Sequence, residues 1–87
     1  MCTGIVETAL VTGSGKGEKG WFKLEQVNVS YDHPVDAMIE HALNLDFVNE
    51  QIGPSARVAV ELSPESAKAL VKAINAALSR GQADLAE

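Results

Sequence analysis

Apolar and polar residues alternate along four segments of the chain, as they do in β-strands that bury one face. We expect strands over residues 5–12, 21–31, 40–48 and 56–62. In the second of these segments the apolar positions are even at Phe22 and Leu24 but odd from Val27 onward. Such a slip of one residue is typical of a β-bulge, which we place near Glu25-Gln26.

The segment between the second and third strands supports two interpretations. Its apolar residues over 35–43 have the three- and four-residue spacing of a helix facing a core. Over residues 39–47, however, every second position forms one regular row, which favours a strand: Ile39, His41, Leu43, Leu45 and Phe47. We therefore predict a connecting loop over 34–38 followed by a strand, and keep a short helix over 35–43 as the alternative.

The last segment has the signals of an amphipathic helix. Ser63 and Pro64 form an N-cap and a proline at the first helical position. The apolar residues that follow make one stripe: Ala67, Leu70, Val71, Ile74, Ala77 and Leu78. Gly81 is a usual stop signal, so we expect the helix to end there and residues 82–87 to fray.

These elements predict a single domain over residues 1–87 with an α+β fold. The order is ββββα, a four-stranded antiparallel sheet with one C-terminal helix on one face; the alternative is ββαβα, with the short helix at 35–43. One helix covers only one side of such a sheet. A chain of 87 residues also has little core of its own. We therefore expect a homo-oligomer that buries sheet surface between subunits.

The glycine-rich stretch TGSGKGEKGW, residues 12–21, is similar in composition to a phosphate-binding loop. Leu10 stands where that loop has its first glycine, and Gly17 stands where it has the hydroxyl that binds magnesium. The next segment also has a strand pattern, whereas a helix follows a phosphate-binding loop. We therefore predict a mobile hairpin connection over 13–20.

Composition and charge argue against several classes of binding partner. The net charge is −5 and the seven basic residues are scattered, which argues against nucleic acid and against an anionic membrane surface. No apolar run approaches the ~20 residues of a membrane span. The N-terminus lacks the basic and apolar regions of a signal peptide. With a single cysteine as well, we expect a cytoplasmic protein.

The chemistry-bearing residues gather near the middle of the chain. Both histidines, His33 and His41, lie within ten residues of Asp32 and Asp36, and Cys2 is the one thiol. Imidazole, thiolate and carboxylate are the ligands of divalent transition metals. Cys2, His33, Asp36 and His41 are thus a candidate metal set, and Asp32 would orient a ligand without binding the metal itself.

Other functions fit the same residues. In one alternative the chain is a small-molecule lyase-type enzyme. Its catalytic residues are then His33 or His41 as acid/base and Asp32 as the orienting carboxylate, in a pocket between subunits. In another, Asp32 and His33 belong to a turn, His41 is a core residue, and the chain is a structural or interaction module without a site.

Short motifs are distributed along the chain up to the terminal helix: MCT, GSGKG, GWFKL, YDHPV, EH and GPSARVAVEL. Together they resemble a family of short uncharacterised bacterial proteins, which brings no assigned activity. The motifs LVTGSGKG and PVDAMIEHAL are similar, more faintly, to segments of formaldehyde-activating enzymes, oligomeric α/β proteins that condense formaldehyde with a pterin. That resemblance implies a helix over 35–43. The catalytic histidine of those enzymes follows the glycine-rich segment, where this chain has Gly20-Trp21-Phe22.

Overall fold

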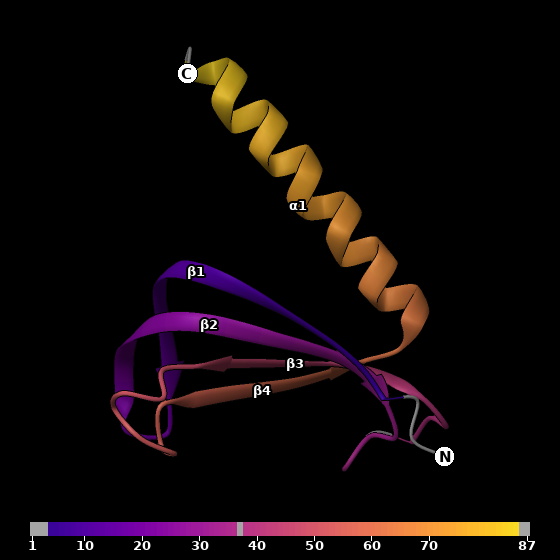
Figure 1. Ribbon diagram of the computed structural model, residues 1–87. Helices are drawn as coiled ribbons and strands as arrows, with labels where there is room; N and C mark the ends of the chain where they lie inside the picture. The colour runs from indigo at the N-terminus through magenta and orange to yellow at the C-terminus, as the bar shows by residue number, and fades with distance from the viewer. Residues whose placement is uncertain (1–3, 37, 86–87) are drawn as a thin grey trace.

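The computed structural model describes residues 4–36 and 38–85, and it confirms the predicted ββββα fold (Figure 1). All neighbouring strands are antiparallel and follow the chain order β1-β2-β3-β4. The elements are β1 (Ile5–Gly17), β2 (Gly20–Asp32), β3 (Ala42–Val48), β4 (Arg57–Leu62) and α1 (Pro64–Asp84).

The strand register separates the sheet into an apolar and a polar face. Val29, Leu45 and Val60 stand opposite one another across β2, β3 and β4, and side chains two residues away share their side of the sheet. We call this side the apolar face; its apolar members are Ile5, Ala9, Val27, Val29, Tyr31, Leu43, Leu45, Phe47, Val58, Val60 and Leu62. The other side, the polar face, includes Asn28, Ser30, Asn44, Asp46, Arg57 and Glu61.

The predicted bulge is present, but the extra residue lies on β1. Leu10 pairs with Gln26 and Gly13 pairs with Leu24, so two residues of β1 stand opposite Glu25 alone. A bulge increases the local twist and bend of a strand pair. Figure 1 shows β1 and β2 bending sharply together toward the end of their hairpin.

The prediction of a loop over residues 13–20 is wrong. β1 continues to Gly17 and β2 begins at Gly20, so only two residues form the turn. Gly20, directly after the turn, has a φ of 104°, a conformation that glycine adopts without strain. The glycines that suggested a mobile loop therefore belong to the paired strands β1 and β2.

These glycines have a packing role instead. Gly13, Gly15 and Gly17 alternate, so they share one side of β1. A Cβ on Gly15 would lie 3.1 Å from Leu24 Cδ2 and 3.6 Å from Val58 Cγ2. The bent end of the hairpin thus lies against β4, and glycine is needed where the two approach.

The segment before β3 forms no helix in its described residues. Residues 35–36 and 38–41 are bends, and the strand begins at Ala42, two residues later than predicted. The loop-and-strand prediction is confirmed and the alternative helix over 35–43 is wrong. Strand pairing favours the strand over the helix, because Ala42 and Leu43 of β3 pair with Asp32 and Tyr31 of β2.

Helix α1 begins as predicted but ends later. The Ser63 side chain accepts a hydrogen bond from the Ser66 N–H at 3.1 Å, which caps the first turn. The helix runs through Gly81 to Asp84, so the predicted stop at Gly81 is wrong. Glycine ends a helix by adopting positive φ. Here Gly81 stays helical, and its carbonyl accepts the N–H of Leu85 at 3.0 Å.

Only the start of α1 packs on the sheet. Ala67 is buried, whereas Leu70, Val71, Ile74 and Leu78 are 42–57% exposed. Figure 1 shows the helix rising away from the sheet after its first turns. Among the described residues no large side chain is fully buried. The interior of a single copy is therefore small.

Candidate functional site

The two histidines flank the paired ends of β2 and β3. His33 directly follows β2, and His41 directly precedes β3. Because Asp32 pairs with Ala42, the two imidazoles are brought side by side. Their ring centroids lie 4.9 Å apart with an interplanar angle of 23°, and the Tyr31 ring also stacks with His41 at a centroid distance of 5.8 Å. The histidines are thus within reach of each other.

The ring of His33 is held in one orientation. Its Nδ1 lies 3.0 Å from the carbonyl oxygen of Glu40. A carbonyl oxygen can only accept, so Nδ1 donates in this contact, and in the neutral ring Nε2 then keeps its lone pair. His33 is exposed, which leaves this nitrogen open to a ligand. Metal-binding histidines commonly have this arrangement, in which one ring nitrogen donates to a carbonyl and the other binds the metal.

Asp32 contacts the main chain of His33. Its Oδ1 accepts the His33 N–H at 2.7 Å, a local contact common where a strand turns into a loop. This hydrogen bond fixes the backbone from which the His33 ring projects. Asp32 therefore shapes the site through the chain, while Glu40 contacts the ring itself.

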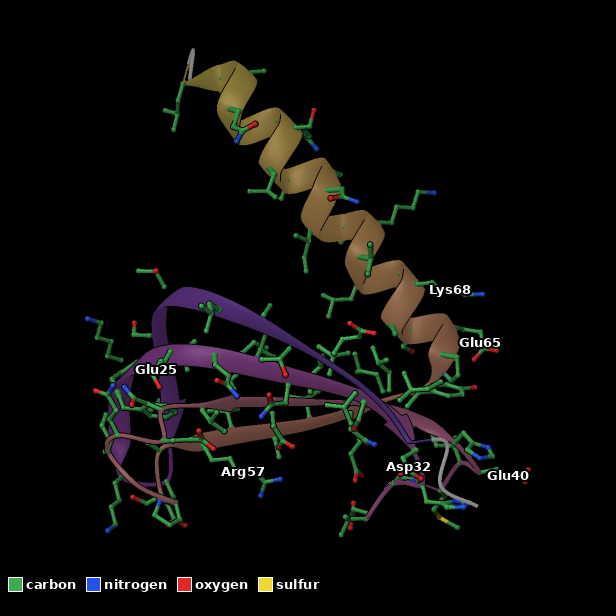
Figure 2. The ribbon with its side chains drawn as sticks, viewed as in Figure 1. Glu25, Asp32, Glu40, Arg57, Glu65 and Lys68 are labelled. Carbon is green, nitrogen blue, oxygen red and sulfur yellow. The ribbon has the colours of Figure 1, made fainter. Side chains whose placement is uncertain are left out.

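Glu61 anchors the loop that carries the histidines. It projects from the polar face of β4, and its two carboxylate oxygens accept the backbone N–H groups of Val35 and Asp36, the latter at 3.1 Å. Such charge-assisted hydrogen bonds are stronger than neutral ones. Asp36 is thus tied to the sheet through its main chain. Figure 2 shows Asp32 and Glu40 at this same end of the molecule.

The candidate ligands are brought together in part. His33 and His41 are adjacent, and Cys2 lies outside the described residues. Across residues 4–36 and 38–85, no group of three or more His, Cys, Asp or Glu side chains has the arrangement of a metal site. The described structure therefore supplies a pair of imidazoles rather than a full coordination shell.

A shallow pocket opens beside the histidines on the polar face. It has a volume of about 240 Å³, and its lining includes Ser30, Asp32, His33, Asn44, Arg57 and Glu61. Asn44 Oδ1 is buried there without a hydrogen-bond partner among the described residues. Arg57 of β4 forms a salt bridge of 2.7 Å with Asp46 of the neighbouring strand β3. The pocket is thus lined by acidic and basic side chains and by one hydrogen-bond acceptor, Asn44 Oδ1, that has no partner among the described residues.

A family model matches the chain over residues 1–87. The chain belongs to DUF6295, a family of unknown function. The resemblance to an uncharacterised family is thereby confirmed. No curated protein and no solved structure matches the chain. Along the described part of the chain, no helix has the length and apolar character to cross a membrane.

Two residues of this site, Glu61 and Asn44, were not predicted from the sequence. Glu61 and Asn44 both occupy polar positions in alternating strands, where a solvated side chain is the ordinary expectation. The loop that Glu61 anchors lies far away in sequence, because Val35 is 26 residues from Glu61. Alternation could place both on the polar face, but only the tertiary structure shows which loop crosses it.

Proposed function

We propose that this chain is a small homo-oligomeric cytoplasmic protein that binds a divalent transition metal through His33 and His41. The observation that carries the proposal is the stacked pair of imidazoles, with His33 oriented by the Glu40 carbonyl. Neutral imidazole suits zinc, copper and nickel. An oriented ring also loses less freedom when it binds.

Further ligands are available from the same end of the fold. Ile5 pairs with Tyr31, so β1 begins beside the histidines. Cys2 precedes β1 by three residues in the sequence, and it is the thiolate ligand of the proposed set. Asp36 offers a carboxylate from the loop. A set of Cys2, His33, Asp36 and His41 has the number and kinds of ligand that a tetrahedral metal site needs.

An enzyme is the second candidate, and the adjoining pocket favours it. His33 borders a space of about 240 Å³ that also contains the carboxylate of Asp32 and the unused oxygen of Asn44. With Nε2 unprotonated, His33 is suited to take a proton from a small molecule in a lyase-type reaction. This function needs no metal, which separates it from the first. A scaffold without a site would show neither activity nor metal binding.

The fainter resemblance to formaldehyde-activating enzymes adds nothing to either candidate. It implies a helix over 35–43, and the described residues of that segment form bends and a strand. The histidine expected after the glycine-rich segment is absent from the sequence. The proposal therefore rests on the histidine pair alone.

The test is a titration of untagged protein with Zn²⁺ in competition with a chromophoric chelator. We expect His33→Ala and His41→Ala each to weaken Zn²⁺ binding at least tenfold. Glu18→Ala, which removes an exposed carboxylate in the β1–β2 turn, is the matched control and should bind as wild type does. Wild-type protein that does not bind Zn²⁺, Ni²⁺ or Cu²⁺, or histidine variants that bind unchanged, would overturn the proposal.

A further inference from the structure

A single copy of this chain exposes more surface than a monomer of its size. Its accessible area is 6559 Å² for a mass of 9.2 kDa. Folded monomers of that mass expose about 4,900 Å². The excess is about 1,600 Å² per copy, and two copies that buried it would hide about 3,200 Å² in total, the range of obligate homodimers.

Two apolar surfaces contribute to this exposed area. One is the stripe of α1, formed by Leu70, Val71, Ile74 and Leu78, which are 42–57% exposed. The other is the apolar face of the sheet, whose apolar members are half-buried apart from the exposed Ile5 and Ala9 and from Val27, which is 8% exposed. Where the sheet is regular, up to the bulge, Glu7 on β1 is the one charged residue that the register places on this face. At and beyond the bulge, the register places Lys16, Lys23 and Glu25 on the same side. Apolar surface of this extent marks an association site.

These two surfaces suit each other. A sheet with one apolar face is normally covered by a helix layer. With 21 residues, α1 is about 31 Å long, more than the ~19 Å width of four strands. Figure 2 shows Glu65 and Lys68 on the side of α1 turned away from the sheet, so the stripe lies on the side facing it. Yet α1 leaves its own sheet soon after Ala67.

We infer that two copies form a two-fold dimer in which the α1 stripe of each lies across the apolar face of the other. The occupant is a second copy because one chain supplies both halves of the contact in equal number. The uncharged stripe also carries nothing that would select a differently charged partner. The inference deepens the homo-oligomeric part of the proposed function and needs no metal, so either can fail without the other.

The first test is the mass of the protein in solution, measured by light scattering and native mass spectrometry without added metal. We expect a dimer for the wild type. Ile74→Glu places a charge in the middle of the stripe and should raise the dimer dissociation constant at least 100-fold. Ala76→Glu adds the same charge on the opposite, exposed side of α1 and should remain dimeric.

A second test identifies the two surfaces. Leu45→Lys places a charge in the middle of the apolar face and should also give monomers. An equimolar mixture of Ile74→Glu and Leu45→Lys should recover a dimer of one copy of each. In that heterodimer the new glutamate faces the new lysine, and the second contact is unchanged. If either variant unfolds alone, refolding the two together from urea gives the same test.

Other arrangements give different results. A monomeric wild type means that α1 closes on its own sheet or that another partner covers these surfaces. An Ile74→Glu protein that stays dimeric indicates sheet-to-sheet packing. A Leu45→Lys protein that stays dimeric indicates helix-to-helix packing. A mixture that stays monomeric shows that the stripe and the apolar face do not meet. Each of these results overturns the inference.

Discussion

Filling the space at Gly15 tests the packing of the bent hairpin against β4. Valine at this position places its Cβ 3.1 Å from Leu24 Cδ2 and 3.6 Å from Val58 Cγ2, and its two methyl groups extend into the same space. Overpacking of this kind costs about 1–3 kcal/mol. Replacing glycine in a strand recovers about 0.5–1 kcal/mol. We therefore expect Gly15→Val to lower the free energy of unfolding by about 1–2 kcal/mol.

Gly13 provides the matched control. A Cβ there would meet nothing within 4 Å, and its backbone does not need positive φ. Gly13→Val should therefore leave stability unchanged or raise it by up to about 1 kcal/mol. Urea unfolding followed by far-ultraviolet circular dichroism, at one protein concentration for all variants, gives the comparison. The packing argument is refuted if the two variants lose the same stability, or if Gly15→Val loses none.

Two further substitutions test contacts that hold loops to the sheet. Asn49 is 7% exposed; its Nδ2 donates to the Lys23 carbonyl at 2.9 Å and its Oδ1 accepts the Gln51 N–H at 3.1 Å. Asn49→Ala should cost about 1–3 kcal/mol in the same unfolding assay, and a loss below ~0.5 kcal/mol would contradict this assignment. Glu61→Ala removes both acceptors of the histidine loop, so amide exchange at Val35 and Asp36 should accelerate and Zn²⁺ affinity should fall several-fold. Unchanged exchange would show that Glu61 does not anchor the loop, and Glu18→Ala is again the control.

Local pattern predicted much of the fold. The alternation of apolar residues places β2, β3 and β4 to within a few residues, because pairing and burial impose a period of two on each strand. The start of α1 follows from Ser63 and Pro64, whose effects act within one turn. Both features depend on neighbours in sequence, which explains why they can be read without a structure.

The mistaken predictions concern glycines. Gly81 was expected to end the helix and the glycines of residues 13–17 to form a loop, since glycine is common in both settings. Their conformations depend on contacts that the sequence does not show: Gly15 lies against Leu24 and Val58, and Gly81 stays inside an unbroken helical turn. Glycine permits unusual backbone conformations but does not require them.

The candidate site was predictable in its residues and not in its geometry. His33 and His41 stand out because they are the only histidines in the sequence. Their approach depends on the pairing of Asp32 with Ala42, and the orientation of His33 depends on the Glu40 carbonyl. The anchoring by Glu61 comes from a strand distant in sequence. Contacts of this kind arise only when the whole sheet has formed.

The most direct test of the central claim is a nuclear magnetic resonance titration of ¹⁵N-histidine-labelled protein with Zn²⁺. With two histidines in the chain, the imidazole spectrum contains two spin systems that single variants assign. The account predicts His33 in the Nδ1–H form before metal is added, and a change at the metal-binding nitrogen of both rings as Zn²⁺ approaches stoichiometry. Imidazole signals of both residues that stay unchanged through the titration would contradict it.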